Sequence, residues 1–490
     1  MDVKEREKIN RMCHPRGLAI FGGMGRMGAF GHSIMCSHTL YGYPGTIYPI
    51  SHKGDEVLGR KIYRSVLEVE GPVDLASVSV PAPMVPGVLR ECLKKGVAGA
   101  TIHTSGFAES GRDGQALQDE IADIAKQGLK IIGPNCFGIH CPIGGTTFLP
   151  GFDYPGESGG VGMVFQSGGM ANDLIHEATA TGVRFSKVFS FGNGCDLDAI
   201  RLMEYLADDP ETEIIAAYLE GIRDGRRFLE VVKSITPHKP VLVWKGGLTP
   251  FGGRATLSHT ASLGGESQIW KAALNQVGAV AVEGAEGLMD TLTALSFLKK
   301  PGRSTAIMGG GGAIGVHSAD VAFQLGLEVP VFSPDTQTRL KEILPTDGAG
   351  LANPLDMLTP ALPIDQVIQL AETVMTQEPI DVLLAISLLH AIDINSKAFG
   401  NLMGVELPGA KIYFEELVEA FQQMKEVSGK EIMVVIDNRG HREEDLETEK
   451  VFRQIRRLFQ EAGMPVFATG ERALFGLRNA NAAHRHLKRG

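Results

Sequence analysis

LAIFGGMGRMGAFGHS, residues 18–33, carries the strongest signal for the fold of this chain. An apolar run of strand character at 18–22 leads directly into glycines that form a G-x-G-x-x-G pattern at Gly23, Gly25 and Gly28. Glycines at a turn from strand to helix let backbone N–H groups approach an anion at the positive end of the helix. The stretch therefore predicts a parallel α/β sheet that binds an anionic ligand at its carboxyl edge.

Similar alternation of short β-branched runs with amphipathic helical stretches continues along the 490 residues. The first group of runs includes TIYPI (46–50), VDLASVSV (73–80), GATIHT (99–104) and LKIIG (129–133), and breaks occur at 142–162 and 299–304. This pattern predicts three successive α/β domains, the first with a parallel sheet of Rossmann type. We expect the fold to be a Rossmann-like domain followed by two flavodoxin-like parallel-sheet domains. We expect the domains to cover residues 1–145, 146–299 and 300–490.

Composition and charge exclude several classes of protein. The formal charge of −10 offers no basic surface for nucleic acid, and no apolar run is long enough to span a bilayer. The polar start MDVKEREKINR lacks the apolar core of a secretory signal, which predicts a cytoplasmic protein. The six cysteines are scattered without zinc spacing, so we expect reduced thiols and no metal site.

The segment after the second predicted strand selects the ligand of the first domain. A dinucleotide site needs an acidic residue about 20 residues beyond the glycine loop, whereas this chain reads YPISHKG and offers Lys53. A cation suits the phosphorylated ribose of coenzyme A better than it suits NAD. The VPAP turn (80–83) and HTSGFAE (103–109) end the next two strands, so we expect both at the same ligand-binding edge.

A glycine-bracketed histidine marks the middle domain. His259 lies in WKGGLTPFGGRATLSHTASLGGES (244–267), which has neither helical nor strand periodicity and predicts a long functional loop. An imidazole with a pKa near 6.5 has an unprotonated nitrogen that can attack a phosphoryl centre at neutral pH. Glu220, at the end of AAYLEG, is the candidate that fixes the tautomer of His259.

A second phosphate cradle follows the strand VGMVFQ. Ser167, Gly168 and Gly169 stand where this strand turns into a helix, and free N–H groups with a hydroxyl can hold phosphate there. An ordinary serine N-cap followed by a glycine turn is the alternative interpretation. Cys136 in GPNCFGI has no histidine base placed beside it by sequence, so we expect it to pack rather than to act as a nucleophile.

These motifs together resemble the α subunit of ADP-forming acyl-CoA (acetyl-CoA) synthetase, a relative of succinyl-CoA synthetase. The matching motifs occur in the family's order: the glycine loop, YPISHKGDEVLG, VPAP, SGFAE, GPNCFGI, FQSGG, YLEGIRDGRRF and SHTASLGG. In the third domain the resemblance rests mainly on the glycine turn at 309–315 and on NPLDM (353–357).

The resemblance implies an acid–thiol ligase that converts acyl-CoA, phosphate and ADP into carboxylic acid, CoA and ATP through an acyl phosphate and a phosphohistidine. It makes His259 the phosphorylated residue, Glu220 its stabilising partner, and Ser167, Gly168 and Gly169 the phosphate cradle. The expected CoA-binding residues are Gly22, Gly23, Met24, Arg26, Gly28, Lys53, Val80, Pro81, Ser105 and Gly106. Nothing in the chain resembles an ATP-grasp domain, so ADP or ATP with Mg²⁺ is expected on a β subunit, in an α2β2 heterotetramer.

Two departures and two alternatives accompany this interpretation. The first loop, GGMGRMG, is less polar than in many relatives, and GNGCDLD (192–198) differs from theirs, which leaves the CoA contacts and the acyl pocket open. The glycine patterns at Gly23, Gly25, Gly28 and at Gly310, Gly312, Gly315 would also suit an NAD-dependent oxidoreductase. A CoA-binding regulatory protein that has lost the chemistry is the other alternative.

Overall fold

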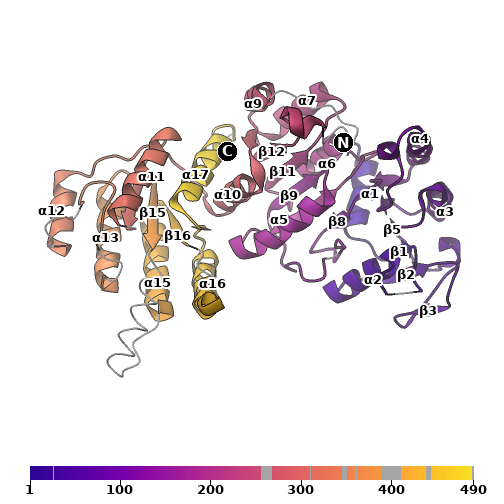
Figure 1. Cartoon of the computed structure of the whole chain (residues 1–490), viewed down its shortest axis with the longest axis horizontal. Coiled ribbons are helices and arrows are strands. Elements are labelled where there is room, and N and C mark those ends of the chain that lie inside the picture. The colour runs from indigo at the N-terminus through magenta and orange to yellow at the C-terminus, as the bar shows by residue number, and fades with distance from the viewer. Residues whose placement is uncertain are drawn as a thin grey trace. The chain divides into compact units, whose positions relative to one another are not determined.

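The computed structural model describes residues 1–25, 27–149, 151–254, 267–309, 311–344, 350–358, 362–387, 410–437 and 443–487. They form two compact units, each built from parallel sheets flanked by helices (Figure 1). The first consists mainly of Met1–Thr179 and Arg184–Gly284 and holds two large sheets and a two-stranded one, and the second consists mainly of Ala285–Arg485 and holds a four-stranded sheet. None of the helices in these ranges combines the length and apolar character that crossing a membrane requires.

The first sheet is parallel and has the order β2-β1-β5-β6-β7. Its strands are β1 (Gly17–Phe21), β2 (Thr46–Ile50), β5 (Leu75–Val78), β6 (Gly99–Ile102) and β7 (Lys130–Ile132). Counted along the chain this is the doubly wound order 2-1-3-4-5, in which ligands bind where the order reverses, between the first and third strands. The reversal therefore lies between the ends of β1 and β5.

Helices cover both faces of this sheet because side chains alternate along each strand. Leu18 and Ile20 pack with α1 (Val3–Cys13) and α2 (Phe30–Tyr41). Ala19 and Phe21 pack on the other face with α3 (Val85–Lys95) and α4 (Arg112–Lys126). Shorter elements complete the domain: β3 (Glu56–Val57), β4 (Arg60–Lys61), and the 3-10 turns η1 (Val66–Glu68), η2 (Ala82–Met84) and η3 (Ala108–Ser110).

A buried carboxylate holds two arginine side chains at the amino edge of the first sheet. Asp74 precedes β5 with its side chain 1% exposed, and it accepts hydrogen bonds from Arg11 and Arg16 at 2.8 Å each. Burial raises the pKa of Asp74, but the bonds from both arginines outweigh it and hold the pKa at about 2. This edge is thus fixed by its own side chains, which leaves the carboxyl edge for ligands.

The second sheet repeats the same winding. Its order is β13-β12-β11-β9-β10-β8, with β8 antiparallel to β10. From β9 onward the order along the chain is again 2-1-3-4-5, and it reverses between β9 and β11. The strands are β8 (Gly138–His140), β9 (Val161–Phe165), β10 (Phe185–Ser190), β11 (Ile214–Leu219), β12 (Val241–Lys245) and β13 (Val280–Val282).

The helices of the second sheet include α5 (Gly168–Thr181), α6 (Ala199–Asp208), α7 (Gly225–Ile235) and α9 (Ser267–Gln276). Leu202 of α6 and Phe228 of α7 belong to one apolar core with Ala217 and Val243 of the strands. Sequence reasoning missed β8, which lies inside the glycine-rich GPNCFGIH, and it also missed β3, β4 and β13, which have two or three residues each.

The second unit contains a parallel sheet whose described strands follow the order β14-β15-β16-β17. Here Gly309 has φ +95, and an added Cβ would lie 2.3 Å from the Ile386 carbonyl oxygen, so only glycine fits this turn. Asn353 accepts a hydrogen bond from the Ile307 N–H at 2.9 Å, which brings NPLDM beside the turn.

The remaining elements of the second unit are its strands, β14 (Thr305–Gly309), β15 (Val382–Ser387), β16 (Glu431–Ile436) and β17 (Val466–Phe467), the 3-10 turn η4 (Glu443–Asp445), and the helices α10 (Gly284–Phe297), α11 (Gly312–Gln324), α12 (Pro334–Ile343), α13 (Ile364–Gln377), α15 (Ala410–Ser428), α16 (Leu446–Glu461) and α17 (Gly470–His484). The predicted fold class, α/β with parallel-sheet domains, is confirmed, although β8 pairs antiparallel with β10 and β3 pairs antiparallel with β4.

Candidate functional site: two crevices at the strand reversals

The first crevice opens where β1 and β5 end. Gly22 follows β1 with φ +154, and a Cβ there would lie 2.2 Å from Ser79 Oγ, so the two strand ends can approach this closely only with glycine. A cavity of about 260 Å³ lies at this point. Five of the residues predicted to bind CoA line it: Gly22, Gly23, Lys53, Val80 and Pro81.

The other predicted CoA-binding residues lie in different settings. Met24 is 2% exposed and packs in the apolar core, so its side chain does not line the cavity. Gly28 has φ +84 in the loop before α2. Ser105 is exposed, and a Cβ on Gly106 would lie 3.3 Å from that of Ala82, so this turn adjoins the VPAP segment. Arg26 lies outside the described residues.

Arg64 is a cation of the first crevice that sequence reasoning missed. It lines the cavity with Lys53 and donates to the carbonyl oxygens of Ser51 at 3.1 Å and Gly54 at 2.6 Å. It also pairs with Asp55 at 2.7 Å. Arg64 thereby braces the loop that carries Lys53. No motif singled it out, because its role depends on how the chain folds back through β3 and β4.

The second crevice begins at the N-terminus of α5. Ser167 caps this helix, with its Oγ accepting from the Met170 N–H at 3.4 Å and its carbonyl oxygen accepting from the Ala171 N–H at 3.2 Å. A Cβ on Gly168 would lie 2.4 Å from the Phe137 ring, whereas a Cβ on Gly169 would meet nothing within 4 Å. Packing thus explains Gly168, while Gly169 leaves open space beside the first turn, whose N–H groups have no intrahelical partner.

Glu220 lies at the same edge, and Gln166 fixes it there. The side-chain oxygen of Gln166 accepts from the N–H groups of Glu220 at 2.8 Å and Gly221 at 3.2 Å. The Tyr218 hydroxyl donates to Glu220 Oε1 at 3.3 Å, and Glu220 is 8% exposed. The structure therefore brings Glu220 and the Ser167 cradle together across the strand reversal. FQSGG contained Gln166, but nothing in the sequence paired it with Glu220.

His259 belongs to residues 255–266, which lie outside the described part of the chain. The stretch that leads to it, expected to lack regular structure, is helical at 250–254. The reason is local: Thr249 Oγ1 accepts from the Gly252 N–H at 3.0 Å, and Pro250 at the first helical position has a suitable φ. The expectation of an irregular segment was wrong for these five residues.

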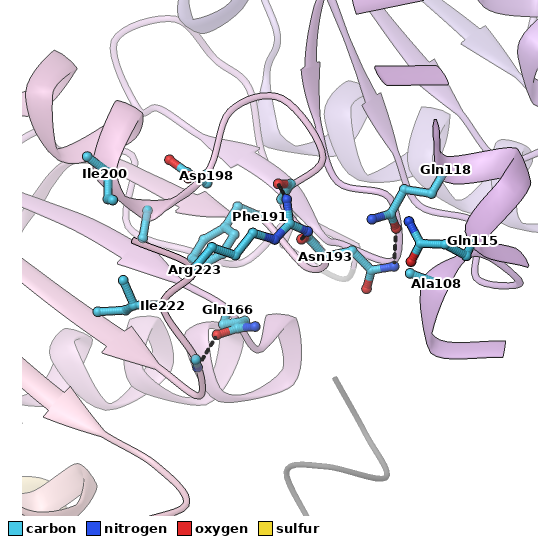
Figure 2. A pocket seen from close by; sticks show the side chains of 13 residues that line it. Ala108, Gln115, Gln118, Gln166, Phe191, Asn193, Asp198, Ile200, Ile222 and Arg223 are labelled. Carbon is cyan, nitrogen blue, oxygen red and sulfur yellow. Dashed lines mark hydrogen bonds between the residues drawn. The ribbon is translucent and has the colours of Figure 1, made fainter. Parts of the chain in front are cut away.

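A cavity of about 410 Å³ adjoins the second crevice (Figure 2). Gln166 and Gly221 line it from the strand reversal, and Ala108 and Gln118 line it from the first domain. Asn193 donates to Gln118 at 2.9 Å across it, and Arg223 donates to the Asn193 carbonyl oxygen at 3.1 Å. The wall is thus mixed, with amide and guanidinium groups beside Phe191, Ile200 and Ile222.

Cys136 packs, as expected. Its thiol donates to the carbonyl oxygens of Ile102 at 3.3 Å and Ile132 at 3.6 Å, and it is 4% exposed. Burial raises the pKa of Cys136 to about 12. A thiolate at neutral pH is therefore rare at this position, which disfavours Cys136 as a nucleophile.

Two family models match this chain. The model described as a CoA binding domain matches residues 16–142, and the model of the succinyl-CoA ligase like flavodoxin domain matches residues 158–295. Each match covers the domain that holds one of the two crevices. The resemblance inferred from the motifs is confirmed.

Similar proteins point the same way. The α subunit of acetate–CoA ligase (ADP-forming) II from Pyrococcus furiosus is 37% identical over 382 residues, which cover 77% of this chain and 82% of that protein. An ADP-forming acetate–CoA ligase from Methanocaldococcus jannaschii is 39% identical over 73% of this chain and 50% of its own length.

Among solved structures, an acetyl-coenzyme A synthetase from Ca. Korarchaeum cryptofilum, in complex with phosphate and ADP, matches with a TM-score of 0.79. It is 27% identical, and the match covers 98% of this chain and 97% of that one. The chain therefore belongs to the family of the α subunits of ADP-forming acetate–CoA ligases, which are acid–thiol ligases.

Proposed function

We propose that this chain is the α subunit of an ADP-forming acyl-CoA synthetase that converts acyl-CoA, phosphate and ADP into a carboxylic acid, CoA and ATP. The observation that carries the proposal is the pairing of Glu220 with the N-terminus of α5 through Gln166, at the strand reversal of the domain that contains His259. The family assignment does not support the two alternatives, an NAD-dependent oxidoreductase and a regulatory protein without chemistry.

In this proposal CoA enters through the first crevice. Lys53 and Arg64 supply positive charge for its phosphates, and the glycine loop supplies backbone N–H groups. The Thr104 hydroxyl donates to the Val80 carbonyl oxygen at 2.7 Å, so the turn that contains Ser105 and Gly106 continues the wall from Val80. Ala108, shortly after this turn, lines the 410 Å³ cavity. This continuity supports a path for the pantetheine arm from the first crevice toward the second.

The second crevice would perform the phosphoryl chemistry in three steps. Inorganic phosphate attacks the thioester carbonyl, which releases CoA and leaves an acyl phosphate. His259 then attacks the phosphorus atom, the carboxylate leaves, and phosphohistidine remains. ADP finally takes the phosphoryl group and becomes ATP. The helix N-terminus at Ser167, Gly168 and Gly169 would stabilise the phosphoryl oxygens, and Glu220 would hold the proton on the other ring nitrogen of His259.

The nucleotide step would take place on a partner. Relatives whose names contain "subunit alpha" are covered over 82% and 71% of their length, whereas two relatives named without a subunit are covered over 50%. This difference supports a separate β subunit that carries the ATP-grasp domains, ADP or ATP, and Mg²⁺. An α2β2 assembly in the cytoplasm, and the division of this chain into modules 1–145, 146–299 and 300–490, belong to the same proposal.

Reconstitution tests the proposal. The chain, combined with its β subunit, Mg²⁺, ADP and phosphate, should form ATP from at least one acyl-CoA in a panel. The panel contains acetyl, 4-hydroxybutyryl and feruloyl thioesters, after the names of three relatives. The isolated chain should form none. ATP formation by the chain alone would contradict the subunit assignment, and a complex inactive on every thioester would contradict the activity.

A further inference from the structure

Lys245 is a buried cation at the second crevice that the proposed chemistry has not yet used. It is the last residue of β12, next to β11 in the sheet, and is 7% exposed. Its ammonium group donates to the Glu220 carbonyl oxygen at 2.8 Å and to the Gly246 carbonyl oxygen. It also lies 5.6 Å from the centroid of the Trp270 ring.

These contacts place one ammonium group between Glu220 and the first residue of the stretch that leads to His259. Glu220 is held from both neighbouring strands, because its N–H donates to Gln166 and its carbonyl oxygen accepts from Lys245. Gly246 is the first residue after β12 and begins the stretch that leads to His259. Lys245 therefore contacts both the candidate partner of His259 and the base of the segment that carries His259.

Lys245 and Lys187 are both buried lysines of the second sheet, but their charges meet different partners. A buried ammonium group costs several kcal/mol in desolvation unless an anion compensates it. Lys187, which is fully buried, meets Asp209 at 2.9 Å and also pairs with Glu211. Within the described residues Lys245 has no carboxylate oxygen within 4.0 Å and contacts only carbonyl dipoles and a ring.

The environment of Lys245 also leaves its charge incompletely neutralised. Burial lowers the pKa of Lys245, and the nearby charge of Glu220 partly opposes that effect. A phosphoryl group brings about two negative charges into a site. An anion arriving at the carboxyl edge would therefore gain from a cation already fixed below it, without reorganisation of the protein.

We propose that Lys245 is a positioning residue for phosphoryl transfer. It holds Glu220 and the first residue of the stretch that leads to His259 in place, and it supplies a buried counter-charge to phosphohistidine. This inference rests on the proposed function, since it assigns a role within the same site. It predicts that the lifetime of the phosphorylated chain depends on the charge at position 245.

Lys239, two residues before the start of β12, offers a matched control. It precedes β12 at the opposite edge of the sheet and donates to the carbonyl oxygens of Leu206 at 2.9 Å and Asp209 at 2.7 Å. Burial lowers its pKa as well. Lys239→Met should therefore disturb the fold in a similar way to Lys245→Met, but at the edge remote from the phosphoryl chemistry.

The test follows the acid-labile label in the complete complex. The wild-type complex is charged with radiolabelled ATP and Mg²⁺, nucleotide is removed, and loss of label from this chain is timed. Lys245→Met should shorten the lifetime or lower the extent of labelling by about 10–100-fold, and Lys239→Met should match the wild type. Lys245→Gln keeps N–H donors for the carbonyl oxygens but has no charge, so its label should be lost as in Lys245→Met.

The outcomes separate the two proposals. Wild-type lifetime and extent of labelling in Lys245→Gln, or an equal loss in Lys239→Met, would overturn the role of Lys245 while leaving the proposed function in place. A wild-type complex that never acquires acid-labile label would instead overturn the proposed function. Thermal unfolding and CoA binding of each variant provide the comparison for folding, and both should change equally in the two Met variants.

Discussion

The first and second sheets have the same strand order, yet their two crevices hold charge differently. In the first crevice, Lys53 is exposed and Arg64 is partly so, and glycines bring the backbone to the cavity. In the second crevice, Glu220 and Lys245 are 8% and 7% exposed, and hydrogen bonds fix the backbone around them. An exposed cationic crevice suits recognition of a ligand whose charge does not change. A buried carboxylate and a buried ammonium group, each fixed by its own hydrogen bonds, suit a step in which charge moves.

Removing the acid from the second crevice should have the largest effect. Glu220→Gln keeps the shape but cannot stabilise a protonated or phosphorylated His259, so phosphoryl transfer should slow by about 10²–10⁴-fold. Rapid-quench labelling of the complex measures this rate. Glu230→Gln on α7 is the control, because Glu230 is exposed and makes only a 3.8 Å contact with Arg227. Labelling at the wild-type rate in Glu220→Gln would remove Glu220 from the site.

Removing the cation Lys53 from the first crevice should weaken the binding of CoA and leave phosphoryl transfer unchanged. Lys53→Ala should weaken CoA binding by about tenfold, equivalent to about 1.4 kcal/mol, and should leave labelling by ATP unchanged. Dephospho-CoA lacks the phosphate on the ribose. If Lys53 contacts that phosphate, Lys53→Ala and the wild type should bind dephospho-CoA equally well. Lys61→Ala, which removes a nearby lysine that lies over the Tyr63 ring, is the control. An equal effect of Lys61→Ala would show that the loss is general to surface charge.

The smallest effects on ligand binding should come from the glycines of the α5 N-terminus, where substitutions separate packing from binding. Gly168→Ala places a Cβ 2.4 Å from the Phe137 ring and should destabilise the chain by about 1–3 kcal/mol. Gly169→Ala meets no atom within 4 Å and should leave the melting temperature unchanged or higher, while phosphate binds several-fold more weakly. Calorimetry with and without phosphate measures both quantities. Unchanged phosphate affinity in Gly169→Ala would place the anion elsewhere.

The sequence predicted the strands of both crevices well because their signals are local. Apolar β-branched runs next to glycine mark buried parallel strands, and β2 begins and ends at the predicted residues 46 and 50. Ser167 and Glu220 were singled out for the same reason, since each stands directly at a strand end. The helix at 250–254 was missed, although Thr249 and Pro250 form an N-terminal helix signal, because the surrounding glycines suggested a loop.

Contacts between distant segments could not be predicted in this way. Gln166 reaches Glu220 across 54 residues of sequence, and Lys245 reaches it across 25. Gln166 directly follows β9 and Lys245 ends β12, both of which read simply as apolar runs, and their partners follow from which strands are neighbours in the sheet. Arg64 depends similarly on the fold of the β3–β4 hairpin. Met24 was wrongly placed for the opposite reason: it lies inside the glycine motif, yet its side chain packs in the core.

Mapping the phosphorylated residue is the decisive experiment, because the proposed roles of Glu220 and Lys245 both require phosphoryl transfer in the second crevice. The complex is labelled with ATP and Mg²⁺, and the chain is digested and analysed under alkaline conditions that preserve phosphohistidine. The account predicts acid-labile, base-stable label on the peptide that contains His259, and none in His259→Asn. Retention of the label in His259→Asn, or its recovery on another peptide, would contradict the account.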